Sequence, residues 1–80
     1  MISCNQHDYI EIVCMYRYPV KLTLKSGEII EGAAVDTVSD ELREECIKLA
    51  TESGETLVVL NQLKQLEVTV ENPHLKLLLF

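Results

Sequence analysis

The sequence predicts a mainly β fold with one N-terminal helix, in which a small antiparallel sheet is strongly bent into an open barrel. Apolar and polar residues alternate strictly over Val20–Leu24, which is typical of a half-buried strand. The turn residues Ser26-Gly27 follow, and then a second β-rich segment, Glu28–Glu31, so these residues predict a hairpin. The small residues of Gly32–Ala34 then allow the second strand to bend sharply and another backbone to approach closely.

The side chains also indicate the register of this hairpin. A two-residue loop would set Leu22 opposite Glu31, which places a carboxylate against a core position. A three-residue loop that ends at Gly27, with positive φ at this glycine, sets Leu22 against Ile30 and Lys21 against Glu31 instead. We therefore predict the three-residue loop, because it pairs apolar with apolar and cation with anion.

The segment before the hairpin, Ser3–Arg17, has no turn residue after Asn5 and predicts a helix. Asn5 can cap this helix, with Asp8 reaching back as in a capping box. The helix has to end near Arg17, because Tyr18 precedes a proline and is pushed to an extended conformation.

Helical spacing gives this segment two distinct faces. One face gathers, together with the stem of Arg17, the side chains expected in the core: Ile10, Val13 and Cys14. Another gathers Asp8, Glu11 and Met15. The alternative, a strand, would place Glu11 on one face with Tyr9 and Val13.

Residues 39–50 fit two secondary structures. Ser39 can cap a helix with an apolar stripe, and the local pattern favours that interpretation. The same residues also fit an acidic loop followed by a strand over Glu45–Glu52, with Ile47, Leu49 and Thr51 on one face. Because a curved sheet needs a third strand here, we predict at most a helical turn near residues 40–43 and then the strand.

The remaining chain predicts two further strands and an apolar tail. A turn at Ser53-Gly54 leads to a strand over Glu55–Leu60, and a break at Asn61-Gln62 leads to one over Leu63–Val70. The apolar tail, residues 74–80, is too short to span a bilayer and is expected to add one more strand.

Length and composition indicate one domain over residues 1–80. The chain is 48% hydrophobic, so disorder is not expected. Thirteen acidic residues against seven basic ones give a formal charge of −6, which disfavours direct binding to nucleic acid and suits a basic protein surface. Taken alone, this charge is better explained by solubility than by a basic partner.

The three cysteines, Cys4, Cys14 and Cys46, show no pairing pattern. The sequence also has no signal-peptide pattern and no long apolar span. We therefore expect a reduced, cytoplasmic protein with idle thiols and no membrane contact.

Several motifs of this chain resemble those of a known family. The hairpin pattern of Val20–Gly27, continued by Ile30–Gly32 and Asp36, is similar to the Sm-like fold. The matching residues of the whole chain up to about Val68 resemble Rof, the family of Rho-binding antiterminators; they are Cys4, Asp8, Ile10–Cys14, Leu22–Lys25, Gly27, Ala34 and Asp36.

The resemblance implies a function and a partner. Rof-like proteins are small acidic inhibitors of transcription termination factor Rho, and they occupy the primary RNA-binding surface of its N-terminal OB-type domain. Such a site is a basic groove with aromatic platforms, so a carboxylate cluster can pair with the Lys and Arg that otherwise hold phosphates. We expect the same here, with a monomer as the acting form and a dimer through the apolar tail as the alternative.

The surface that we expect to bind Rho joins acids of the helix to the acidic loop beyond the second strand. Its residues are Asp8, Tyr9, Glu11, Asp40, Glu41, Glu44 and Glu45. Tyr9 is the candidate amphipathic anchor, although it fits the core as well. For any single acid, a solvated face is about as good an explanation. Asp36 is a weaker candidate, because an acid at this position more often forms a turn or bulge.

No catalytic residue, cofactor or metal site is predicted. Cys14 with His7 as a base lacks a third group to orient the pair. A zinc site on Cys4, His7 and Cys14 lacks a fourth ligand and the usual spacing. The competing hypotheses are an Sm-like RNA-binding protein, which would need basic or aromatic loop residues, and an acidic interaction module with another basic partner.

Overall fold

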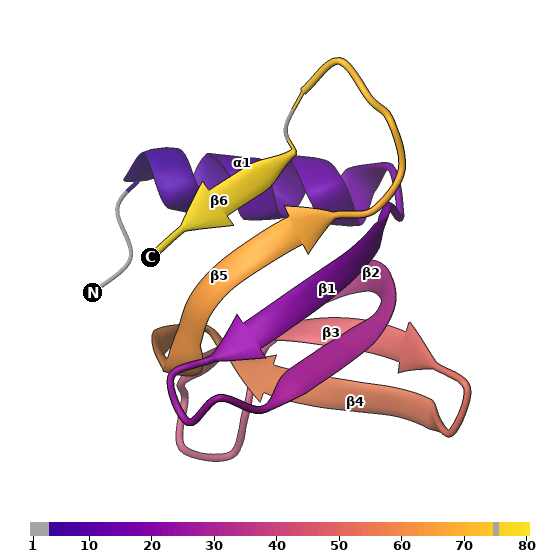
Figure 1. The fold of residues 1–80 in the computed structure, drawn as a ribbon. Coiled ribbons are helices and arrows are strands. Elements are labelled where there is room, and N and C mark those ends of the chain that lie inside the picture. The colour runs from indigo at the N-terminus through magenta and orange to yellow at the C-terminus, as the bar shows by residue number, and fades with distance from the viewer. Residues whose placement is uncertain (1–3, 75) are drawn as a thin grey trace.

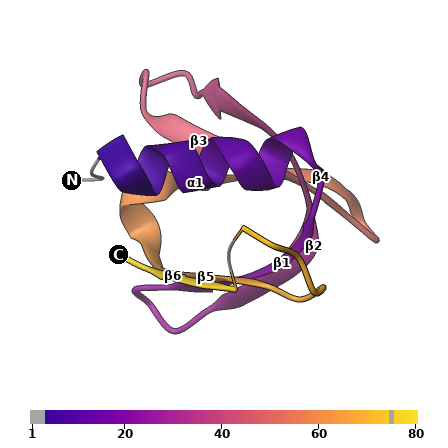
Figure 2. The ribbon, with the colours of Figure 1, turned by 90° about the horizontal axis from the view of Figure 1, so that it is seen from above.

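The computed structural model describes residues 4–74 and 76–80. Its elements, in chain order, are helix α1 (Cys4–Met15), strands β1 (Pro19–Leu24), β2 (Ile29–Ser39), β3 (Glu45–Thr51) and β4 (Gly54–Val59), the short 3-10 helix η1 (Leu60–Gln62), and strands β5 (Leu63–Val68) and β6 (Leu77–Leu79). The six strands form one antiparallel sheet in the order β4-β3-β2-β1-β5-β6. The sheet is bent and open, and α1 lies across one end of it (Figures 1 and 2). The predicted fold class is confirmed.

The β1–β2 hairpin has the predicted register. Leu22 pairs with Ile30 and Lys21 with Glu31. Gly27 has a φ of 95°, and the Leu24 N–H donates to the Glu28 carbonyl at 2.8 Å. The predicted three-residue loop is therefore confirmed. It follows from the requirement that core positions of one strand face core positions of the other.

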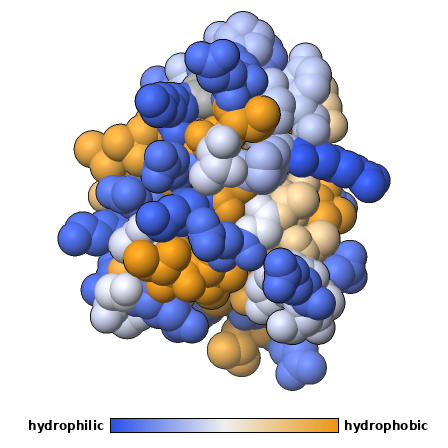
Figure 3. Space-filling view, turned by 45° about the vertical axis from the view of Figure 1, so that its right-hand side comes forward, coloured by the Kyte–Doolittle hydropathy of each residue, from blue (hydrophilic) through white to orange (hydrophobic). Residues whose placement is uncertain are grey.

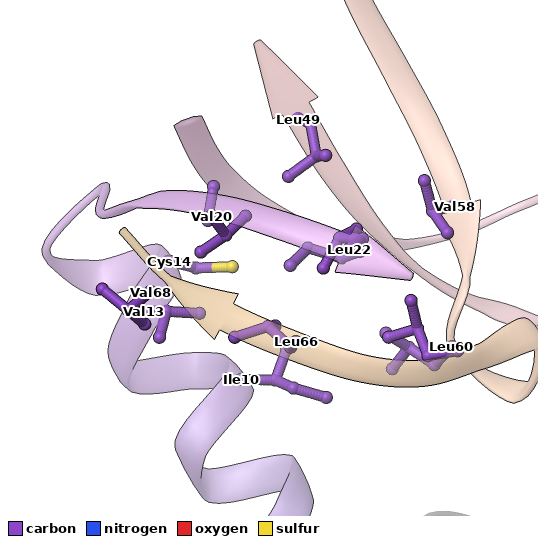
Figure 4. Close-up of a cluster of buried hydrophobic side chains, with 13 residues drawn as sticks. Ile10, Val13, Cys14, Val20, Leu22, Leu49, Val58, Leu60, Leu66 and Val68 are labelled. Atoms are coloured by element: carbon purple, nitrogen blue, oxygen red, sulfur yellow. The ribbon is translucent and has the colours of Figure 1, made fainter. Parts of the chain in front are cut away.

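The core lies between α1 and the concave face of the sheet (Figure 4). Ile10 and Val13 of α1 are fully buried against a mainly aliphatic cluster from β1, β3 and β5. Burying two such side chains stabilises the fold by roughly 3–6 kcal/mol, which fixes the position of the helix.

Two details of the predicted helix are wrong. Asn5 is not the cap, because the helix already includes Cys4, and the described first turn contains no acid. The predicted start at Ser3 lies outside the described residues. A cap contributes only about 1 kcal/mol, so the packing of the apolar stripe outweighs it. Arg17 does not continue the buried stripe either, because it lies beyond the helix and is exposed.

The helix ends in a Schellman motif. The Tyr18 N–H donates to the Val13 carbonyl at 3.0 Å and the Arg17 N–H to the Cys14 carbonyl at 3.1 Å. Arg17 sits at the left-handed position of this motif with a φ of 53°, where glycine is usual. The turn thus stores backbone strain at Arg17.

We expect Arg17→Gly to raise the melting temperature. Relief of the strain is worth about 1 kcal/mol, or roughly 4–8 °C for a chain of this size. Thermal unfolding followed by circular dichroism measures the shift. Arg17→Ala removes the same side chain but keeps the strain, so it should leave the melting temperature nearly unchanged. Equal shifts in the two variants would show that the guanidinium, and not φ, is the cause.

The predicted strand after the acidic loop is confirmed. Residues 45–51 form β3 with Ile47 and Leu49 fully buried, and residues 40–44 form a loop. Asp40 organises this loop, because its Oδ1 accepts hydrogen bonds from the N–H groups of Leu42 and Glu44, both at 2.9 Å. The local helical pattern is overridden because β2 offers these residues a partner strand and a core.

The C-terminal region differs from the prediction at one point. β5 ends at Val68, so Val70 lies outside the sheet and is exposed. The chain turns away at Thr69, whose N–H donates to the Pro19 carbonyl at 3.0 Å. Residues 77–79 then return as β6 beside β5. Gln6 of α1 donates its Nε2–H to the Leu79 carbonyl at 2.8 Å, which ties the helix to this last strand.

None of the helices formed by the described residues is long and apolar enough to cross a membrane. The three cysteines are free, with Cys14 and Cys46 buried and Cys4 exposed.

Candidate protein-interaction surface

His7 connects two of the predicted site residues. Its Nδ1 lies 3.6 Å from Glu11 Oε1, one turn further along α1, and its Nε2 pairs with Glu45 Oε2 at the start of β3. Glu11 and Glu45 are 34 positions apart in the chain (45 minus 11), and the bend of the sheet brings both to the same imidazole. Glu11 of the helix and Glu45, the first acid of β3, therefore belong to one surface.

The two carboxylates raise the pKa of His7 above 6.5, mainly through the hydrogen bond to Glu45, while burial opposes the shift. The folded-state pKa thus exceeds the unfolded one. The contribution of His7 to stability is therefore fully present below about pH 6.5 and is lost as the pH rises through the folded-state pKa.

We expect the stability difference between the wild type and His7→Gln to be larger at about pH 5.5 than at about pH 8.5. Urea unfolding of both proteins at the two pH values measures it. Comparing the proteins at each pH cancels the titration of the other carboxylates, which both share. A difference that does not depend on pH would show that the protonated imidazole does not fasten α1 to β3.

Two shallow hollows run along β2 between α1 and the start of β3. The first is lined by Glu11, Cys14, Met15, Val35, Asp36 and Thr37, and the second by Thr37, Val38, Ser39 and Glu45. They share Thr37, and we refer to these two adjoining hollows together as the acidic furrow. Its carboxylates are Glu11, Asp36 and Glu45.

The carboxylates of the acidic furrow affect the pKa of the Cys14 thiol. Burial raises the pKa of this thiol to about 11, and the negative charges of Asp36 and Glu11 add to the effect. Asp36 was a weaker candidate from the sequence, because an acid at this position more often forms a turn or bulge, and its Oδ1 accepts a hydrogen bond from the Thr37 N–H at 2.8 Å. An irregularity in the β2–β3 register between Ala34 and Asp36 marks a bulge there, which re-aims the side chains that follow.

The loop acids lie apart from the helix. The 40–44 loop hangs at the lower end of the sheet, whereas α1 crosses the upper end (Figure 1). Glu41 and Glu44 are exposed, and Asp40 is half-buried with its carboxylate engaged in the loop. The predicted residues thus form a band that runs from α1 through Glu45 to this loop.

Tyr9 and Asp8 lie on α1 with exposed side chains, and Tyr9 is 37% accessible. Two apolar residues near the band were not predicted. Met15 lines the furrow and Leu42 sits in the acidic loop, and both are strongly exposed, at 71% and 79%. The signal that could have indicated Leu42 is an isolated leucine among charged residues.

The geometry gives no nucleophile–base pair from Cys14 and His7. Both ring nitrogens of His7 face carboxylates, and the pKa of Cys14 is raised, so the thiol stays protonated at neutral pH. Among residues 4–74 and 76–80, no three His, Cys, Asp or Glu side chains are placed so that they could hold a metal ion.

Comparison with known proteins gives the family. A family model described as a modulator of Rho-dependent transcription termination (ROF) matches residues 1–80. Among solved structures, the chain is similar to YaeO bound to magnesium from Vibrio cholerae O395, with 42% sequence identity and a TM-score of 0.88 over 91% of this chain and 95% of that one. A search of curated proteins found no match. The chain therefore belongs to the Rof family, whose members modulate Rho-dependent transcription termination.

Proposed function

We propose that this protein inhibits Rho-dependent termination by placing its acidic furrow, together with the exposed acids of the 40–44 loop, on the primary RNA-binding surface of Rho. The observation that supports this proposal is that Glu11 and Glu45 meet at His7 and that Asp36 lines the same hollow as Glu11, although the three acids come from three different elements. Bound there, the protein keeps nascent RNA off Rho.

The chemistry of the two surfaces is complementary. A groove that binds single-stranded RNA holds phosphates with Lys and Arg and stacks bases on aromatic rings. The furrow offers carboxylates in place of phosphates, and Met15, Tyr9 and Leu42 offer exposed apolar area beside them. Such an arrangement speeds the encounter of the two proteins and excludes RNA from the same groove.

The proposal includes no enzymatic step, no cofactor and no direct contact between this protein and RNA. A chain of net charge −6 repels phosphate backbones. The site of action is the cytoplasm, where Rho meets nascent RNA.

The experiment that tests this function is fluorescence anisotropy of a labelled C-rich RNA, titrated with the protein in the presence and absence of purified Rho. We expect the protein to release RNA from Rho and to leave the anisotropy of free RNA unchanged. Direct RNA binding would favour the Sm-like RNA-binding hypothesis. If RNA stays on Rho while the two proteins still bind each other, the contact lies outside the RNA site.

Binding to Rho should also depend strongly on salt. Because carboxylates carry the contact, raising the salt concentration from about 50 mM to about 300 mM screens the attraction, and affinity should fall roughly tenfold or more. Isothermal titration calorimetry across this range measures the effect. A flat salt series would indicate that exposed apolar residues such as Leu42 and Met15 dominate the interface.

A further inference from the structure

His7 lies between two carboxylates of the surface proposed to bind Rho. Glu11 is one turn further along α1, with its Oε1 3.6 Å from Nδ1 of the ring, and Glu45 at the start of β3 pairs with Nε2. Asp8 is adjacent in sequence, but neighbours at i and i+1 do not face each other on a helix. Among the residues that the structure describes, the ring therefore pairs with one acid from α1 and one from β3, and with no other charged group.

Both carboxylates remain accessible to a partner. The side chains of Glu11 and Glu45 are 60% and 58% accessible, whereas that of His7 is 33% accessible. Hydrophilic side chains cover much of the face in Figure 3, with hydrophobic ones in separate areas between them. Exposed hydrophilic residues are thus common on this protein. What distinguishes Glu11 and Glu45 is that one ionisable ring of the chain itself pairs with both.

The protonation state of the ring decides whether it can hold both acids. A protonated imidazole has an N–H on each nitrogen and a positive charge, so it can donate to Glu11 and Glu45 at the same time. A neutral imidazole has one N–H and one lone pair, so one of the two carboxylates then faces a lone pair and loses its partner. Loss of the proton from His7 therefore releases a carboxylate and makes the acidic furrow more negative.

We propose that His7 regulates binding to Rho, because its protonated ring competes with the cations of Rho for Glu11 and Glu45. This inference rests on the function proposed above, since it concerns the same acidic furrow. When the ring is charged, it neutralises the two acids from within the chain. When the ring is neutral, the acids are available to Lys and Arg of the partner. The proton on His7 and bound Rho thus oppose each other, and by linkage the binding of Rho releases this proton.

The pH range of the effect follows from the same contacts. The two carboxylates raise the pKa of His7 above 6.5. The ring is therefore still mostly protonated at about pH 6 and becomes neutral only as the pH rises through this higher folded-state pKa. Affinity for Rho should increase over the same range.

Isothermal titration calorimetry of the full chain with purified Rho, at about pH 6 and about pH 8.5, tests the inference. From the lower to the higher pH, we expect the affinity of the wild type to rise roughly three- to tenfold relative to that of His7→Gln, whose amide is neutral throughout. Comparing the two chains at each pH cancels the titration of groups on Rho, which affects both equally. His7→Lys keeps a cation throughout this range and should bind weakly at both pH values.

A matched control and a second measurement identify the titrating group. His74→Gln removes the other histidine of the chain and should keep the pH dependence of the wild type. Repeating the titrations at about pH 7 in buffers with different enthalpies of ionisation counts the protons exchanged on binding. The wild type should release more protons than His7→Gln, by up to about one per bound chain.

The outcomes separate this inference from the proposed function. If the relative affinity does not change with pH and both chains release equal numbers of protons, His7 does not regulate binding, although displacement of RNA from Rho would still support the proposed function. A relative affinity that falls as the pH rises would also overturn the inference and would show that the charged ring favours binding. Loss of the pH dependence in His74→Gln would assign it to that residue instead. If none of the chains binds Rho at either pH, the proposed function fails together with the inference.

Discussion

Neutralising the acidic furrow with Glu11→Gln, Asp36→Asn and Glu45→Gln together is expected to weaken binding to Rho by roughly 10- to 100-fold. The amides keep the size of the side chains and one acceptor oxygen, so the charge is lost and the other oxygen becomes an NH2 donor. Glu11 and Glu45 flank His7, and Asp36 lies in the same furrow as Glu11. Calorimetry or anisotropy competition with labelled RNA measures the change.

The control changes the net charge equally at sites away from the furrow. Glu28→Gln, Glu52→Gln and Glu71→Gln are exposed positions outside the proposed surface, and this triple variant should bind within about threefold of the wild type. Equal loss in both variants would mean that net charge alone drives binding. A separate pair, Glu41→Gln with Glu44→Gln, measures what the acidic loop contributes. If neither set changes affinity, the interface lies elsewhere.

Gly32→Ala should have the largest effect on stability. A Cβ at this position would lie 2.7 Å from the carbonyl oxygen of Ala50 and 3.1 Å from Cγ2 of Thr51. The first of these atoms belongs to the backbone of β3 and cannot rotate away, so β2 and β3 have to separate where the sheet bends. Overpacking of this kind costs about 1–3 kcal/mol, which lowers the melting temperature by roughly 5–20 °C.

Substitution of a glycine with positive φ distinguishes this steric effect from the effect of backbone strain. Gly27 and Gly54 both have positive φ, but a Cβ at either would meet no atom within 4 Å. Gly27→Ala should therefore cost only about 1 kcal/mol. The melting temperatures of Gly32→Ala and Gly27→Ala, measured by thermal unfolding, compare the steric effect with the strain effect. If Gly27→Ala were the more damaging, close approach of the strands would not be what requires glycine at position 32.

The sequence predicted correctly those parts of the fold that depend only on contacts between neighbouring segments of the chain. The hairpin register followed from which side chains could face Leu22, and the bend followed from the small residues at 32–34. The β3 prediction succeeded because the demand of the sheet for a partner strand was weighed above local helix propensity. The Asn5 cap failed because a local signal was trusted against the packing of α1.

For the candidate surface, the sequence could predict which residues take part but not how they are arranged. Sequence indicated the acids, but not that Glu11 and Glu45 would meet at one histidine, because this contact depends on how far the sheet bends. His7 itself was considered as a base or metal ligand, since a sequence shows its chemistry but not its neighbours. Asp36 lies at a bulge, as expected for an acid at this position, and it also lines the furrow, whereas the carboxylate of Asp40 organises its loop.

Two long-range side-chain contacts hold α1 on the sheet, and their length affects the order of folding. Gln6 reaches Leu79, 73 positions away in sequence, and His7 reaches Glu45, 38 positions away. Closing such long stretches of chain costs entropy that short hairpins avoid, so the hairpins of β1–β2, β2–β3 and β3–β4 can form before either contact. The helix, although it precedes the strands in the chain, is therefore expected to reach its final position after these three hairpins have formed.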